Sequence, residues 1–316
     1  MNSKLSSVVV IGAGTMGHSL ALMFAVGGKS VHLTDVDSSR LEAVRPLMLS
    51  ELKTLSEAGE FDGDPAVVMG RLSTSVDFRK AASSCEWVVE AIVENIEAKR
   101  SLYSELVSCI GPQTIVSSNT SYLDVFPLAP EAIQNRFLIT HFFSPPHIVP
   151  LVELVRGPST DPEVISLVQG WLKGINMSPA ILKQFVPGFI VNRLQRAIGR
   201  EMFYMIDEGF ASPEEIDRAV KSSLALRMPI VGVVRRVDYA GVDMALRALK
   251  NPSIGLASED RVSPTVASLV EQGRIGVKAG KGFYEYSGTQ EEILKNRDLK
   301  LLRIKKVMRE LDAFEP

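Results

Sequence analysis

The sequence contains few cysteines, no long apolar run and almost no net charge. Two cysteines, Cys85 and Cys109, in 316 residues cannot form a disulfide framework or a CxxC metal knuckle, so we expect no bound metal and a reducing, cytoplasmic location. The apolar runs are strand-length, far short of the ~18 residues of a membrane span. Residues 1–7 lead straight into such a run, so we expect no signal peptide. A net charge of -2 gives no reason to expect nucleic acid or an anionic membrane as a partner.

The chain does have the length and composition of an ordinary globular protein. Its 316 residues, 46% of them hydrophobic, suffice for two domains, because a single core stops growing near ~250 to 300 residues. Short apolar runs alternate with segments of helical periodicity through the first half of the chain. The runs cover residues 8–11, 31–34, 87–92, 115–118 and 137–139. This alternation predicts an α/β fold built from βαβ units, with a parallel sheet covered by helices on both faces.

The pattern changes after residue 155. Residues 162–173 are predicted to form one more helix of the first domain, and from residue 187 the periodicity is helical with few strand-like runs. We place the domains at residues 1–184, 185–288 and 289–316, the last being an amphipathic C-terminal helix. We expect that helix to lie on its own protein or on a second subunit, with a specific binding partner as the alternative.

A GxGxxG motif stands between the first strand and the first helix, in the order strand, glycine loop, helix. The first glycine permits a tight turn, the second lets the backbone approach a pyrophosphate, and the third lets the helix pack close to the strand. The positive end of the helix then attracts the phosphates. The loop therefore predicts a Rossmann-type doubly wound domain that binds a dinucleotide. We assign its residues to the cofactor: Gly12, Gly14, Thr15, Met16 and Gly17.

Asp35 falls at the end of the second strand, about twenty residues after the glycine loop. A carboxylate there accepts hydrogen bonds from the adenosine ribose and repels a 2′-phosphate, so the predicted cofactor is NAD rather than NADP. Arg40 is expected to lie too far along the chain to reverse that preference. A glycine turn without any ligand is the alternative, and the presence of Asp35 argues against it.

The segment 137–155 carries one carboxylate, Glu153, and two imidazoles, His141 and His147, among apolar and proline residues. A buried, unpaired carboxylate costs several kcal/mol, so Glu153 is expected to have a partner, and a histidine is available. A His–Glu pair in a cleft is suited to general acid/base catalysis. The alternative is a contact that only holds two strands together.

With these residues in place, the chain resembles the L-3-hydroxyacyl-CoA dehydrogenase family over nearly its whole length. The matching blocks are residues 88–95, 118–121, 141–143, 151–153, 187–194, 238–243 and 280–284. The resemblance implies a Rossmann-type NAD-binding domain followed by an all-helical domain that supplies most of a homodimer interface. It also implies oxidation of a small-molecule 3-hydroxyacyl substrate to its 3-keto form, by hydride transfer to NAD.

The resemblance also implies a role for each matching residue. His141 would be the general base, and Glu153 would orient it and stabilise its imidazolium. Ser121 and Asn192 would hydrogen-bond the reacting oxygen, with Ser121 also near the nicotinamide. The remaining positions on the cofactor side are Glu94, Lys99 and Ser144.

Some of these positions have purely structural alternatives. An alternative for Asn192 is a residue at the start of a helix whose side-chain amide already has hydrogen-bond partners. An alternative for Ser121 is a hydroxyl that only hydrogen-bonds within a turn. Lys99 is also compatible with a solvated helix charge. His147 is expected to be a loop residue near the pocket rather than a second base.

Departures from the family pattern concern the substrate. Ser144 stands where the family usually has asparagine, which shortens one polar contact to the cofactor or substrate. Glu57 and Glu60 stand where lysines would suit the phosphates of coenzyme A, and carboxylates there would weaken its binding. The same chemistry on a free hydroxy acid is therefore an alternative, with carnitine, sugar acids and hydroxy-pyridine carboxylates as examples.

Two further classes of function are compatible with a nucleotide-binding domain. The first is a catalytically silent, structural NAD-binding protein, against which the intact set of His141, Glu153, Ser121 and Asn192 argues. The second is a lysine-dependent β-hydroxyacid dehydrogenase. That class predicts a glycine-rich helix with a catalytic lysine between the domains, where this chain instead has residues 187–192, Pro-Gly-Phe-Ile-Val-Asn.

Overall fold

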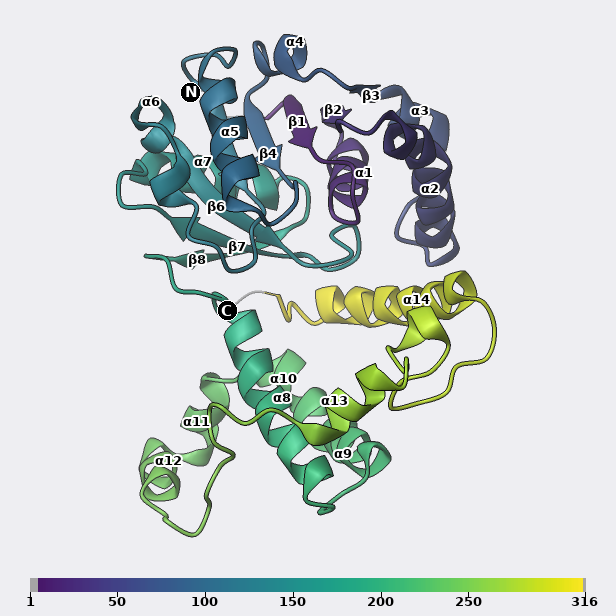
Figure 1. Cartoon of the computed structure of the whole chain (residues 1–316), viewed down its shortest axis with the longest axis vertical. Coiled ribbons are helices and arrows are strands. Elements are labelled where there is room, and N and C mark those ends of the chain that lie inside the picture. The colour runs from purple at the N-terminus through teal and green to yellow at the C-terminus, as the bar shows by residue number, and fades with distance from the viewer. Residues whose placement is uncertain (1–4, 315–316) are drawn as a thin grey trace. The chain divides into compact units, whose positions relative to one another are not determined.

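The computed structural model describes residues 5–314, and the chain separates into two compact units, Met1–Ile190 and Val191–Pro316 (Figure 1). No helix within the described residues is long and apolar enough to cross a membrane.

The first unit is built on a single sheet of eight strands in the order β3-β2-β1-β4-β5-β6-β7-β8. The neighbouring strands are parallel except for β6 and β7, which are antiparallel. The strands are β1 (Ser7–Ile11), β2 (Ser30–Thr34), β3 (Leu72–Ser75), β4 (Trp87–Glu90), β5 (Ile115–Ser118), β6 (Phe137–Phe142), β7 (Leu151–Arg156) and β8 (Ser178–Leu182). The expectation of a wholly parallel sheet is wrong at β7, because the short connection of residues 143–150 has no room for a crossover helix.

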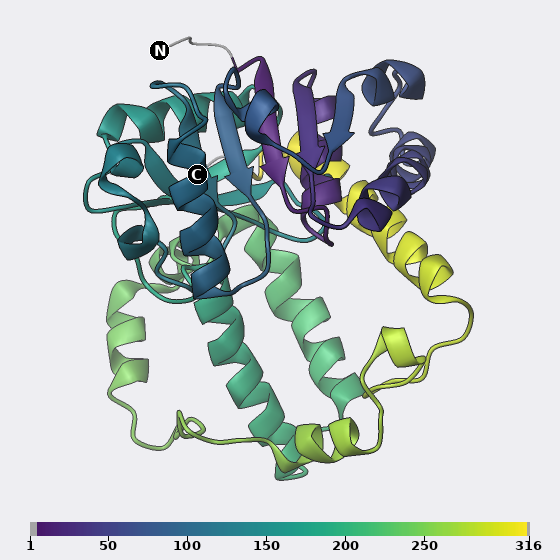
Figure 2. The ribbon, with the colours of Figure 1, turned by 45° about the horizontal axis from the view of Figure 1, so that its top comes forward.

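Helices cover both faces of this sheet, as the strand and helix pattern predicted (Figure 1 and Figure 2). Neighbouring residues of β4 show the two faces. The ring of Trp87 contacts Phe24 of α1 (Gly17–Val26) and Trp171 of α7 (Pro162–Lys173). Val88, on the opposite face, belongs to a buried cluster with Leu102 of α5 (Ile96–Val107). The remaining helices are α2 (Ser38–Glu57), α3 (Pro65–Gly70), α4 (Arg79–Ala82) and α6 (Glu131–Gln134), with a 3₁₀ turn at Phe126–Leu128.

The second unit is helical, as predicted. Its elements are α8 (Val191–Asp207), α9 (Pro213–Ala219), a π-helical turn (Val220–Leu224), α10 (Ala225–Val231), α11 (Arg235–Ala240), α12 (Val242–Leu249), α13 (Pro264–Glu271), a 3₁₀ turn (Val277–Ala279) and α14 (Gln290–Glu310). A capping box formed by Thr289 and Glu292 starts α14. None of the residues of α8 to α13 is buried, and large apolar side chains such as Leu226, Tyr239 and Leu249 are exposed. A single copy of this unit therefore leaves much of its apolar surface in solvent.

Candidate active site

The glycine loop lies between β1 and α1, and two of its glycines are required by packing. Gly12 has φ +106°, and a Cβ there would lie 2.5 Å from the carbonyl oxygen of Ala91. A Cβ at Gly17 would lie 1.6 Å from the carbonyl oxygen of Gly12. A Cβ at Gly14 would instead meet no atom within 4 Å. The open space at Gly14 is where a pyrophosphate can approach the backbone, and no side chain caps the positive end of α1 at Met16.

Asp35 follows β2 and is held by two backbone amides. The N–H of Ala13 donates to Oδ2 at 2.7 Å, and the N–H of Asp37 donates to Oδ1 at 2.9 Å. Arg40, which was predicted to lie too far along the chain to reverse the preference for NAD, lies near this carboxylate in space. The first turn of α2 brings Nη1 of Arg40 to 3.8 Å from Oδ2 of Asp35.

His141 and Glu153 face each other across the antiparallel strands β6 and β7, whose register pairs these two residues directly. Nδ1 of His141 lies 2.8 Å from Oε2 of Glu153, and both side chains are buried. The other carboxylate oxygen, Oε1, accepts the N–H of Ile190 at 2.9 Å. The rings of Phe143 and Phe189 pack against the imidazole, at 4.6 and 5.2 Å between centroids. The predicted pair is thus in contact, shielded from water and able to hold one fixed orientation.

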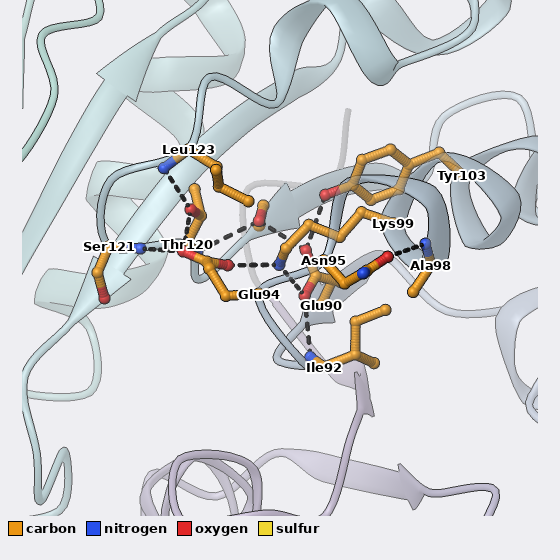
Figure 3. A network of polar contacts seen from close by, with 11 residues as sticks. Glu90, Ile92, Glu94, Asn95, Ala98, Lys99, Tyr103, Thr120, Ser121 and Leu123 are labelled. Atoms are coloured by element: carbon orange, nitrogen blue, oxygen red, sulfur yellow. Dashed lines mark hydrogen bonds and ion pairs between the residues drawn. The ribbon is translucent and has the colours of Figure 1, made fainter.

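A second buried carboxylate, Glu90, ends β4 and collects four donors (Figure 3). Its oxygens accept from Lys99 Nζ at 2.6 Å, Tyr103 Oη at 2.7 Å, Ser118 Oγ at 2.6 Å and the N–H of Ile92 at 2.9 Å. Burial, and next the negative charge of Glu90, raise the pKa of Tyr103 well above its usual value, so the phenol stays a donor. Glu90 was not among the predicted site residues, although it lies in the matching block 88–95 and is a charge at the end of an apolar strand.

Lys99 links this network to Glu94. The lysine is 1% exposed, so the alternative of a solvated helix charge is wrong. Its Nζ lies 3.1 Å from Oε2 of Glu94, while Oε1 of Glu94 accepts from Thr120 Oγ1 at 2.5 Å and from the N–H of Ser121 at 3.0 Å. Burial raises the pKa of Glu94, but the hydrogen bond from Thr120 and the charge of Lys99 outweigh it and leave that pKa below its usual value. Figure 3 shows the Ser121 hydroxyl pointing away from the network.

The other predicted site residues lie on nearby loops or in the second unit. Ser144 is exposed on the connection between β6 and β7, whereas Asn192 belongs to the first turn of α8. On the same connection, Nδ1 of His147 lies 2.5 Å from Oγ of Ser19 in α1. Sequence reasoning missed this pairing, because nothing local links residues so far apart in the chain.

Comparisons with known proteins identify the family of the chain. Residues 7–185 match the family described as the 3-hydroxyacyl-CoA dehydrogenase NAD binding domain, and residues 188–286 match the C-terminal domain of the same family. The protein is therefore an NAD-dependent oxidoreductase with a Rossmann-type domain. It belongs to the 3-hydroxyacyl-CoA dehydrogenase family, and its predicted fold class and cofactor, NAD, are confirmed.

Relatives within the family differ in substrate. The chain is 33% identical to a probable 3-hydroxybutyryl-CoA dehydrogenase of Deinococcus radiodurans, over 88% of this chain and 99% of the relative. It is 29% identical to the 5-formyl-3-hydroxy-2-methylpyridine 4-carboxylate 5-dehydrogenase of Mesorhizobium japonicum, over 96% and 98% of the two chains. A solved structure of a dehydrogenase of that pyridine carboxylate, described as an NAD⁺-dependent dismutase, superposes with a TM-score of 0.86 at 28% identity, over 96% of this chain and 99% of that one. The (S)-3-hydroxybutyryl-CoA dehydrogenase of Ralstonia eutropha superposes with a TM-score of 0.71 at 29% identity, over 90% of this chain and 100% of that one.

Proposed function

We propose that the protein interconverts a secondary alcohol β to a carbonyl group and the corresponding ketone, with His141 as general base and Glu153 as its orienting carboxylate. The contact of 2.8 Å between Nδ1 of His141 and Oε2 of Glu153 carries the proposal. Because Nδ1 faces the carboxylate, Nε2 is the nitrogen that exchanges a proton with the substrate hydroxyl. The negative charge of the Glu153 carboxylate, beside Nδ1, stabilises the imidazolium that forms when Nε2 takes that proton.

The oxidation removes a hydride from the carbinol carbon and a proton from the hydroxyl group of the same alcohol. Bound NAD supplies the acceptor for the hydride from the carbinol carbon. His141 takes the hydroxyl proton, and the electron pair of the O–H bond becomes the second bond of the carbonyl. The rings of Phe143 and Phe189 exclude water from the imidazole, which strengthens its interaction with Glu153.

The cofactor would lie along the carboxyl ends of the parallel strands. The backbone at Gly14 and the start of α1 would hold the pyrophosphate, with Gly12, Thr15, Met16 and Gly17 shaping the loop. Asp35 would accept from the adenosine ribose hydroxyls. The network around Glu94 and Lys99 would border the nicotinamide side, where Ser121 and Ser144 are proposed to contribute polar contacts.

Asn192 is proposed to join Ser121 in hydrogen-bonding the reacting oxygen. Since an oxygen that gains or loses a bond to hydrogen changes its partial charge, fixed donors beside it stabilise the transition state. Ser121 is suited to this role because its amide is fastened to Glu94 while its hydroxyl points away from that contact.

A 3-hydroxyacyl-CoA is the substrate that the family implies, and a free hydroxy acid is the second candidate. The second candidate is favoured by the end of α2, where Glu57 is exposed and Glu60 follows the helix, because two carboxylates there repel the phosphates of coenzyme A. The similarity to a hydroxypyridine carboxylate dehydrogenase points the same way.

A substrate screen that follows NADH absorbance tests both candidates. It compares 3-hydroxybutyryl-CoA with free 3-hydroxybutyrate, carnitine and a sugar acid, each of which carries a secondary hydroxyl group. A preference for the thioester supports the family substrate, and a preference for a free acid supports the second candidate. Turnover unchanged in His141→Ala would contradict the mechanism for either substrate.

The second unit is proposed to pair with a second copy of the chain. The helices α8 to α13 contain no buried residue, and apolar side chains along them face solvent in the single chain. Burying that surface in a homodimer supplies the hydrophobic stabilisation that the unit otherwise lacks. Light scattering behind size-exclusion chromatography tests this proposal, and a monomer mass at micromolar concentration would contradict it.

A further inference from the structure

Two backbone N–H donors converge on the carboxylate of Asp35. The N–H of Ala13 lies 2.7 Å from one oxygen and the N–H of Asp37 lies 2.9 Å from the other. Since both amides belong to the backbone, they stay in place whatever side chain stands at position 35. A side chain without a carboxylate there would leave two N–H donors directed at the space that the carboxylate fills now.

Arg40 adds a positive charge to the same place. Its Nη1 lies 3.8 Å from Oδ2 of Asp35, and its Nε lies 3.6 Å from Oδ2 of Asp37. Both distances are too long for hydrogen bonds, so Arg40 is attracted to the two carboxylates without being fixed by either. The side chain is 58% exposed and can therefore turn toward a ligand.

We infer that Arg40 is a latent ligand for the 2′-phosphate of an NADP-type cofactor, and that the carboxylate of Asp35 is the main group that keeps it from acting. A phosphate at the ribose 2′ position needs charge-assisted donors, and a guanidinium with two backbone N–H groups supplies them. Asp35 opposes that phosphate by like-charge repulsion and by occupying both amides. Asp37 also faces Arg40, but its Oδ1 caps α2 by accepting from the N–H of Ser39 at 3.0 Å, so its charge stays in place and limits the gain.

The inference rests on the proposed role of Asp35 at the ribose, but not on His141 or on the identity of the substrate. On this inference, the preference for NAD over NADP depends mainly on the carboxylate of Asp35. The other groups of a site for the phosphorylated cofactor are already present: the N–H of Ala13 in the glycine loop, the N–H of Asp37 before α2, and Arg40 in the first turn of α2.

The test measures binding by isothermal titration calorimetry, with NAD⁺, NADP⁺ and the fragment 2′,5′-ADP as probes. Asp35→Ser is expected to weaken NAD⁺ binding about 10-fold and to strengthen 2′,5′-ADP binding about 10- to 100-fold, the effect of gaining one charge-assisted hydrogen bond and losing a repulsion. The double variant Asp35→Ser with Arg40→Ala should lose that gain. Asp35→Ser combined with Arg45→Ala is the matched control, because Arg45 is also an exposed arginine of α2, and it should keep the gain.

Thermal melting first establishes that each variant folds, and the isosteric Asp35→Asn repeats the test should the serine variant unfold. A gain in 2′,5′-ADP affinity that survives the removal of Arg40, or no gain in either Asp35 variant, overturns the inference while leaving Asp35 at the ribose. NAD⁺ affinity unchanged by both Asp35 variants overturns the ribose role itself, and the inference with it.

Discussion

Nδ1 of His147 and Oγ of Ser19 lie 2.5 Å apart although 128 residues separate them in the chain. Ser19 is buried in α1, shortly after the glycine loop, and His147 stands in the connection that follows His141. The contact ties the nucleotide-binding helix to the loop whose Phe143 packs against the proposed base. The helix that follows the glycine loop and the connection that follows β6 are therefore joined within the first unit by side chains as well as by the sheet.

Breaking this tie is expected to loosen the connection of residues 143–150. Ser19→Ala removes one partly buried hydrogen bond, so we expect a loss of about 1 kcal/mol in the free energy of unfolding and faster amide hydrogen exchange in that connection. Ser166→Ala is the control, because its hydroxyl bonds only to the carbonyl of Pro162 within its own exposed helix turn. Equal exchange of residues 143–150 in both variants would show that the tie does not hold the loop.

Glu153→Gln is expected to lower kcat by about 10²- to 10⁴-fold, the usual contribution of general acid/base catalysis. The amide keeps the size of the side chain and can still bond to Nδ1, but it cannot stabilise an imidazolium by charge. Affinity for NAD⁺, measured by fluorescence titration, should stay unchanged because the pair does not belong to the nucleotide loop. Since His141 and Glu153 are proposed to act as a unit, the double variant should lose scarcely more than either single one. Additive losses would mean that the two residues act separately.

Lys99→Met is expected to destabilise the first unit by about 3–5 kcal/mol, because it leaves the buried carboxylate of Glu90 and the half-buried one of Glu94 without their shared cation. Tyr103→Phe removes only one of the donors to Glu90 and keeps the ring against Phe137, so a loss of about 1–3 kcal/mol is expected. Urea denaturation at pH 7 measures both values. A Lys99 variant as stable as the Tyr103 variant would mean that the two carboxylates are not held as charges.

The pair formed by His18 and Glu51 predicts a dependence of stability on pH. Nε2 of His18 lies 3.0 Å from Oε1 of Glu51. Burial lowers the pKa of His18, but the hydrogen bond and charge of Glu51 outweigh it, so the pKa in the folded protein lies above its usual value of 6.5. A raised folded pKa contributes stability that is full below pH 6.5 and is lost as the pH rises through the folded value.

The free energy of unfolding should therefore fall as the pH rises above 6.5, which denaturant titrations at several pH values measure. Glu51→Gln should flatten this fall, because the neutral amide no longer favours the imidazolium. The exposed Glu42 of the same helix offers a control, and Glu42→Gln should keep the wild-type slope. An equal slope in the wild type, Glu51→Gln and Glu42→Gln would mean that other groups cause the dependence of stability on pH.

Local patterns along the chain predicted the fold class and most strands and helices of the first unit. The predicted strand at residues 115–118 and the predicted helix at 162–173 coincide with β5 and α7, because buried parallel strands and amphipathic helices are specified by their own residues. The strand predicted at 87–92 ends earlier, at Glu90, because the Glu90 carboxylate takes the N–H of Ile92. The strand β3, Leu-Ser-Thr-Ser, was missed because its residues show no apolar run.

The sequence alone determined the sheet with its covering helices, the glycine loop and the family, since each follows from the type and spacing of nearby residues. The roles of the predicted site residues stay predictions. Only the tertiary structure decided the antiparallel pairing that puts His141 against Glu153, the burial of Lys99 between two carboxylates, and the approach of Arg40 to Asp35. Strand direction and side-chain partners depend on where distant segments pack, and a buried charge selects its partner from whatever the fold brings within a few ångströms.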